Sequence, residues 1–218
     1  HLKDTHGFYL TSFTNNKNKK IYLEIPLPVI IYDNGFKFWM SSKLKHGKEV
    51  INHNGDYYRL YYETNTIYKT NAQGDFIFDE DGKINNIKPI DFSITKNILT
   101  IIMVSLLMLF LFGSLAKSYS KNNGMAKGIG RFFEPIILYI RDDIAIPNIG
   151  AKKYKNYMSF LLTVFFFVWF LNMLGLTPLG VNVTGNIAVT FSLALLTFLI
   201  TNLTCLLYTS DAADERHC

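Results

Sequence analysis

The chain has 218 residues, of which 49% are hydrophobic and 18% are charged, and its formal net charge is +5. It is too apolar on average for an ordinary soluble domain and too charged to lie wholly in lipid, so the two characters must be separated along the chain. The basic residues form no cluster interleaved with stacking aromatic side chains, which argues against a nucleic-acid-binding protein.

The first 91 residues predict a small antiparallel β-rich domain outside the membrane. It contains 12 Lys and Arg against 11 Asp and Glu and no cysteine, so we expect a solvated domain without disulfides. Pro26 and Pro28 interrupt the first β-prone run and place it at an edge or in an extended arm. The β-prone runs are 20–25, 36–40, 57–62 and 76–78, and the turn signals between them are Asn34-Gly35, Asn54-Gly55 and Asp81-Gly82.

Three apolar stretches predict membrane-spanning helices. The first lies within 94–116 and includes an uncharged run from Ile98 to Ala116, which is about as long as the roughly 20 residues that cross a hydrocarbon core. The other two occupy residues 157–204. One runs from Tyr157 to Leu179 and is broken at Pro178, and the next starts at Ile187 and reaches about Leu207. The short segment 180–186 joins them, so we expect a hairpin.

Residues 117–156 predict a cytoplasmic loop that contains an interfacial amphipathic helix. Apolar residues recur at helical spacing from Gly128 to Ile146, but the charged residues among them make the helix too polar to span. Pro135 and Pro147 would mark a bend and a stop. The loop holds eight basic and three acidic residues, which places it in the cytoplasm. The β-rich domain and the segment 180–186 are then periplasmic.

The candidate site residues are the polar ones inside the apolar hairpin. Asn172 costs free energy in lipid, so it should face protein or water, and a plain hydrogen bond between helices is the alternative. Asn182, Asn186, Thr190 and Ser192 lie near the outer end, where solvation at the interface is the simpler interpretation. An amide does not titrate near neutral pH, and no predicted span contains a carboxylate, histidine or arginine. The pattern therefore predicts the wall of a water-filled conduit.

No catalytic residue, metal site or cofactor is predicted. The histidines lack paired metal-ligand spacing, and no Ser, His and Asp arrangement suggests nucleophilic catalysis. The triplets that begin at Asn182 and Asn202 match the glycosylation pattern, but one lies in a turn tight against the membrane and the other inside an apolar helix, so both are interpreted as chance matches.

Four segments in this order resemble the a subunit of the membrane (Fo) sector of bacterial F-type ATP synthases, over about residues 89–204. The resemblance implies a polytopic α-helical stator protein of the bacterial inner membrane that contacts the c-ring and the b subunits and provides two proton half-channels. It also implies that the chain is not catalytic by itself. Asn172 and Asn182 would organise water in the outer half-channel. The four segments are 89–97, 128–135, 167–178 and 181–190.

The chain departs from the family pattern at several positions. Gly175 and Gly180 stand where other members have Asp. The family's essential arginine lies on a helix after the third span, in a segment resembling Leu-Arg-Leu-Phe-Gly-Asn, and no segment here matches it. Residues 205–218 are predicted to be non-native, because Cys205 to Glu215 resembles a translated sequencing adapter; a helix broken at its last turn is the alternative. We therefore expect a piece truncated at both ends.

Two alternatives remain open from the residues alone. One is a different class of protein, an exported β-domain receptor or assembly factor that is anchored by the helices. The other concerns the coupling ion, since nothing in the chain distinguishes H⁺ from Na⁺.

Overall fold

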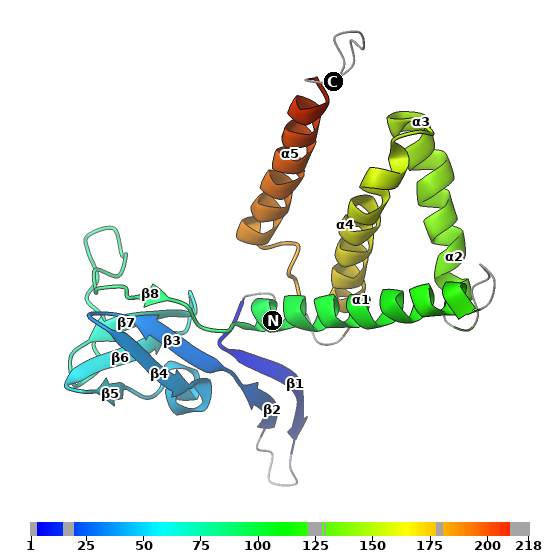
Figure 1. Ribbon diagram of the computed structural model, residues 1–218. Helices are drawn as coiled ribbons and strands as arrows, with labels where there is room; N and C mark the ends of the chain where they lie inside the picture. The colour runs from blue at the N-terminus through cyan, green and yellow to red at the C-terminus, as the bar shows by residue number, and fades with distance from the viewer. Residues whose placement is uncertain (1–3, 15–19, 122–127, 129, 178–180, 210–218) are drawn as a thin grey trace.

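The structure is a computed structural model, and it describes residues 4–14, 20–121, 128, 130–177 and 181–209. A β-rich part comes first along the chain and a helical part follows it (Figure 1). The strand β8 ends at Asp91, and helix α1 begins five residues later at Lys96.

The β-rich part consists of three small antiparallel sheets and one short 3-10 helix. The sheets are the β1–β2 hairpin, the β4–β3–β8 sheet and the β5–β6–β7 sheet. The predicted β-rich character of this part is thus confirmed. The elements are β1 Gly7–Thr14, β2 Lys20–Pro26, β3 Pro28–Tyr32, β4 Phe36–Met40, the 3-10 helix η1 Ser41–Gly47, β5 Ile51–His53, β6 Asp56–Tyr61, β7 Thr66–Thr70 and β8 Ile90–Asp91.

Two of the predicted turns join neighbouring strands. Asn34 and Gly35 connect β3 to β4 with φ values of 51° and 133°, and Asn54 and Gly55 connect β5 to β6 with φ values of 54° and 90°. Tight hairpin turns need positive φ, which glycine adopts freely and asparagine tolerates better than most residues. These dipeptides therefore fix where the two hairpins reverse.

The β4–β3–β8 and β5–β6–β7 sheets share one hydrophobic core. Along β4, Lys37 and Trp39 are buried while Phe36, Phe38 and Met40 are exposed, as the two-residue period of a strand requires. Burial of these large side chains is the main source of stability for this part. The core consists of Val29, Ile31, Trp39, Leu44, Ile51, Tyr58, Leu60 and Ile67.

The outer face of the β4–β3–β8 sheet is apolar and largely exposed. Cross-strand pairing places Phe36 beside Tyr32 and Phe38 beside Ile30. Phe92 lies on the other side of Ile30 from Phe38, because the Phe92 amide donates to the Ile30 carbonyl at 2.8 Å. The side chains of Phe36 and Phe38 are 73% and 60% exposed.

The predicted strand at 76–78 is wrong. Phe78 forms only an isolated bridge with Ile84. The ring of Phe76 instead packs edge-on against Tyr61 and Tyr68, with centroids 5.1 and 6.2 Å apart. The apolar residues that suggested a strand are held by ring contacts and not by a ladder of backbone hydrogen bonds.

The helical part contains three long helices and a broken one. α1 lies across the lower ends of α2 and α4, and α4 and α5 run in opposite directions (Figure 1). Among the described residues, α1 and α4 are long and apolar enough to cross a membrane, and the apolar part of α5, Ile187–Leu203, is shorter. The helices are α1 Lys96–Lys121, α2 Gly130–Tyr139, the π-helix η2 Ile140–Ala145, α3 Ile146–Ile149, α4 Tyr154–Gly175 and α5 Ile187–Thr209.

The segment predicted as an interfacial helix is helical from Gly130 to Ile149, in the three pieces α2, η2 and α3. Pro135 lies inside α2, and the helix widens to a π-helix just before Pro147. Since proline has no amide hydrogen to donate, a local change of helical pairing is expected there. The predicted stop at Pro147 is wrong. The helix continues to Ile149 and ends at Gly150, where φ is 95°.

An aromatic core holds α1, α2 and α4 together. Phe166 of α4 is fully buried, and its ring lies 4.9 Å from that of Phe112 and 5.7 Å from that of Phe133. Val181 and Val183, which follow α4, are buried in the same core. The connection between α4 and α5 is thus anchored to the helices that precede it.

Candidate functional site

Asn172 and Asn182 come together at the connection between α4 and α5. Asn172 lies in the last turn of α4, and Asn182 lies in the connection, between the two buried valines Val181 and Val183. Asn182 is exposed between these two buried valines. The predicted break at Pro178 and the start of the predicted turn at Gly180 lie outside the described residues.

Hydrogen bonds connect the polar residues of this region. The Thr184 hydroxyl donates to Asn172 Oδ1 at 3.0 Å, and the Gly185 amide donates to Asn182 Oδ1 at 3.0 Å. The Thr190 hydroxyl, in the first turn of α5, donates to the Thr184 carbonyl at 2.7 Å. We call Asn172, Asn182, Thr184 and Thr190 the polar junction. It links the end of α4 to the start of α5.

Two glycines make room for this arrangement. A Cβ atom at Gly175 would lie 3.0 Å from the Val181 carbonyl oxygen, closer than most such contacts. A Cβ atom at Gly185 would lie 2.4 to 2.7 Å from the Asn182 carboxamide. At Gly175, the absence of a side chain therefore lets the connection approach α4.

The polar junction is uncharged. No Asp, Glu, His, Lys or Arg occurs between residues 156 and 209. The carboxamides of Asn172 and Asn182 are exposed, so they are able to contact water or a neighbouring molecule. Chemically the arrangement offers hydrogen-bond donors and acceptors but no group that exchanges a proton near neutral pH.

Thr184 is the residue that sequence reasoning missed. It entered only as the third residue of a chance glycosylation triplet, whereas the structure makes it the partner of Asn172, 12 residues away. The available signal was its place in the short polar link between two apolar helices, two positions after Asn182.

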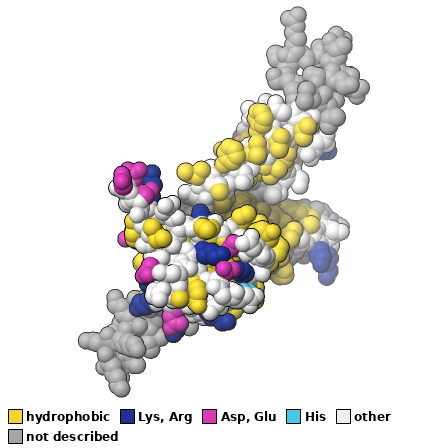
Figure 2. All heavy atoms as spheres, turned by 90° about the vertical axis from the view of Figure 1, so that its left-hand side faces the viewer, with side chains coloured by type: hydrophobic (Ala, Val, Ile, Leu, Met, Phe, Trp, Pro, Cys, Tyr) yellow, Lys and Arg dark blue, Asp and Glu magenta, His cyan; other side chains and the backbone are white. Residues whose placement is uncertain are grey.

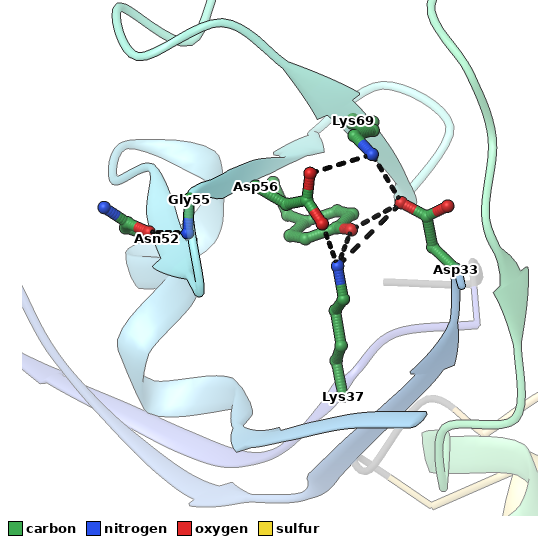
Figure 3. Close-up of polar contacts among 7 residues, drawn as sticks. Asp33, Lys37, Asn52, Gly55, Asp56 and Lys69 are labelled. Atoms are coloured by element: carbon green, nitrogen blue, oxygen red, sulfur yellow. Dashed lines mark hydrogen bonds and ion pairs between the residues drawn. The ribbon is translucent and has the colours of Figure 1, made fainter. Parts of the chain in front are cut away.

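A second polar cluster lies in the β-rich part, where the β3–β4 turn, β6 and β7 meet. Figure 3 shows Lys37 and Lys69 pointing toward the carboxylates of Asp33 and Asp56. Lys37 pairs with Asp56, and the Lys69 ammonium lies 2.9 Å from both carboxylates. We call these four residues and Tyr58 the ion cluster.

The ion cluster is internally satisfied. The buried Tyr58 hydroxyl donates to Asp33 at 2.6 Å and accepts from Lys37 at 2.6 Å. Hydrogen bonds from Lys37 and Lys69 lower the pKa of Asp56 to about 2, and those from Tyr58 and Lys69 lower the pKa of Asp33. Burial, reinforced by Asp33, raises the pKa of Tyr58. Opposite charges that satisfy one another indicate a structural role, which is to hold the β3–β4 turn, β4, β6 and β7 together.

No metal site is found in the part of the chain that the structure describes, where no three His, Cys, Asp or Glu residues gather. The polar junction is therefore the candidate site. Hydrophobic side chains are exposed along α5, which begins at this junction (Figure 2).

Comparison with known proteins gives two family matches. Residues 98–210 match the ATP synthase A chain family, and residues 1–92 match a domain of unknown function (DUF8433). No solved structure is significantly similar to the chain.

Curated relatives match the helical part. The chain is 44% identical over 115 residues to an ATP synthase subunit a of Myxococcus xanthus, 42% over 126 residues to one of Pelodictyon phaeoclathratiforme and 37% over 132 residues to subunit a 2 of Chlorobaculum tepidum. These matches cover 51%, 57% and 58% of this chain. Each covers 37% of the relative, so the chain spans little more than a third of the length of these relatives.

Proposed function

Because the chain belongs to the ATP synthase A chain family, we propose that it is part of a proton-conducting stator subunit of the Fo sector, which the comparisons support at family level. Its helices form one wall of the outer proton half-channel, and Asn172 and Asn182 organise water along that wall. ATP synthesis itself takes place on other subunits. The partners are the c-ring and the b subunits.

The polar junction is the observation that carries this proposal. A pair of exposed carboxamides is costly in hydrocarbon, and their retention at the end of two apolar helices is explained if they contact water. The junction contains no charge that would trap a passing proton. It therefore suits a conduit wall, while the proton-exchanging groups belong to other parts of the complex.

The proposed topology places three spans in the bacterial inner membrane. α1 and α4 are the first two spans. The third is α5, whose apolar part is Ile187–Leu203. The eight basic residues of segment 117–156 hold that loop in the cytoplasm. The β-rich part and the polar junction are then periplasmic, on the side where the outer half-channel opens.

The test is proton conductance of the assembled synthase that carries the full-length subunit. Asn172→Leu and Asn182→Leu keep the approximate side-chain size and remove the groups that hold water, so each should lower conductance at least about fivefold. Conductance is measured as decay of a pH gradient in vesicles and is normalised to the amount of assembled complex.

Asn202→Leu is the matched control. Asn202 is an exposed carboxamide of α5 whose Nδ2 donates to the Phe198 carbonyl of its own helix at 2.8 Å, and its removal should leave conductance unchanged. If the variants at Asn172 and Asn182 conduct as well as this control, the conduit role of the polar junction is wrong.

A further inference from the structure

Thr184 determines how the Asn172 carboxamide is turned. Its hydroxyl donates to Asn172 Oδ1, so the amide oxygen is engaged within the protein. No hydrogen bond joins the two N–H groups of that carboxamide to another described residue, and the Asn172 side chain is exposed. An Asn side chain offers an acceptor at one end and donors at the other, and in this structure the Thr184 hydroxyl engages the acceptor end.

Asn182 is turned in the same sense by a different contact. Its Oδ1 accepts from the Gly185 backbone amide, which is only able to donate, and this fixes the identity of the oxygen. The Asn182 side chain is exposed. In both carboxamides of the polar junction a group of the protein therefore engages the oxygen, which leaves the N–H donors available to water.

The backbone of Thr184 is itself held in place. The Thr190 hydroxyl donates to its carbonyl at 2.7 Å and lies 3.4 Å from the Asn186 carbonyl. Val183, the residue before Thr184, is 1% exposed and packs in the helical core. These contacts fix the position from which the Thr184 hydroxyl reaches Asn172.

We propose that Thr184 is a positioning residue of the conduit, which orients Asn172 so that the wall presents N–H donors to the water. This inference rests on the proposed function. A water bound to an N–H group offers its oxygen to the protein, and both of its hydrogens are then free to bond onward. Donors in the same orientation at Asn172 and Asn182 thus give the water chain a single direction along this wall.

The experiment uses four variants of the full-length subunit in the assembled synthase: Thr184→Val, Thr184→Ser, Asn172→Leu, and Asn172→Leu combined with Thr184→Val. Valine keeps the shape of threonine without the hydroxyl, so the Asn172 amide becomes free to turn. Conductance should fall about threefold, which corresponds to one intramembrane hydrogen bond of about 0.6 kcal/mol. Serine retains the hydroxyl and should restore conductance to near the original value.

The double variant separates positioning from a structural role. If Thr184 acts through Asn172, Thr184→Val has no further effect once Asn172 is leucine. Thr163→Val is the matched control, since the Thr163 hydroxyl donates at 2.8 Å to the Ser159 carbonyl of its own helix. It should conduct as the unmodified complex does.

Each outcome has a distinct meaning. If Asn172→Leu has no effect, the proposed function is wrong. If Asn172→Leu lowers conductance but Thr184→Val does not, or if the two losses multiply, the positioning role is wrong and the conduit role stands. Failure of serine to restore conductance also overturns positioning, because only the shape of the side chain would then matter.

Discussion

The β-rich part and the helical part use similar apolar residues in opposite ways. In the β-rich part, Trp39, Tyr58 and Ile67 are at most 3% exposed. In the helical part, Leu109 and Phe110 are 72% and 74% exposed, and only 22% of the most apolar stretch of α1 and 11% of that of α4 are buried. The first part is thus stabilised by its own core, whereas the second requires an apolar environment that the chain does not supply.

Polar groups follow the same division. In the β-rich part, charged groups pair with one another in the ion cluster and hold strand connections together. In the helical part, the uncharged polar junction engages its two carboxamide oxygens within the protein and leaves their N–H groups without a partner among the described residues. A satisfied cluster is expected where the role is stability, and unsatisfied exposed donors are expected where the role is contact with water.

The largest expected effect lies in the core of the β-rich part. Ile67→Ala should lower the free energy of unfolding by about 3 kcal/mol, because it removes buried methyl groups and leaves a cavity. Ile90→Ala removes the same atoms from a side chain that is 59% exposed. It should change the free energy of unfolding by less than about 0.5 kcal/mol. Urea unfolding of the chain in detergent measures both, with Trp39 as the only tryptophan after Trp169→Phe.

This pair also tests whether the outer face of the β4–β3–β8 sheet is free. Ile90 lies on that face beside Tyr32. A loss at Ile90 as large as that at Ile67 would mean that the outer face is covered in the detergent-solubilised chain. The contrast between a buried and an exposed apolar surface would then fail for this sheet.

Acid should affect the β-rich part before the helical part. The folded pKa values of Asp33 and Asp56 lie below their ordinary value of 3.8, and that of Asp56 is about 2. Carboxylates with lowered pKa contribute stability above the unfolded pKa and lose it as pH falls through the folded pKa. Unfolding detected by Trp39 should therefore become easier between about pH 4 and pH 2.

Asp56→Asn provides the comparison for the acid experiment. It removes the carboxylate whose pKa is lowered most clearly, so stability should be lower at neutral pH and should depend less on pH in the acid range. Helix content from circular dichroism should change little over that range, because the long helices α1, α4 and α5 contain no carboxylate. An unchanged acid dependence in the variant would show that the ion cluster does not determine it.

Much of the architecture was predictable because its signals are local. β4 matches the predicted run 36–40, and α5 begins at the predicted Ile187. At α5 the Asn186 side chain accepts from the Ala188 amide at 3.0 Å, which is the cap that such a helix start needs. Uncharged runs of about 20 residues likewise identify apolar helices from composition alone. Whether α5 completes a third span stays a prediction.

The remainder depends on contacts between distant residues. The Lys69 and Asp33 pair in the ion cluster is 36 positions apart, and only the sheet topology brings its members together. The strand predicted at 76–78 is reduced to an isolated bridge between Phe78 and Ile84, because the chain turns back at Gly82 after only a few residues. At the polar junction, sequence chemistry selected Asn172 and Asn182, but the orientation of their carboxamides required the positions of Thr184 and Gly185.

The smallest expected effect lies on the exposed face of α1. Met103 is 42% exposed, whereas Met108, five residues later on the same helix, is 8% exposed and packs in the core with Phe166. In detergent, Met108→Ala should reduce the stability of the helical part by about 2 kcal/mol, and Met103→Ala by less than about 0.5 kcal/mol. Thermal unfolding followed by Trp169, after Trp39→Phe, measures both. Equal losses would mean that detergent does not substitute for the natural neighbours of this face. A loss at Met103 only in the assembled complex would identify it as a subunit contact, because lipid and detergent both accept an exposed methionine.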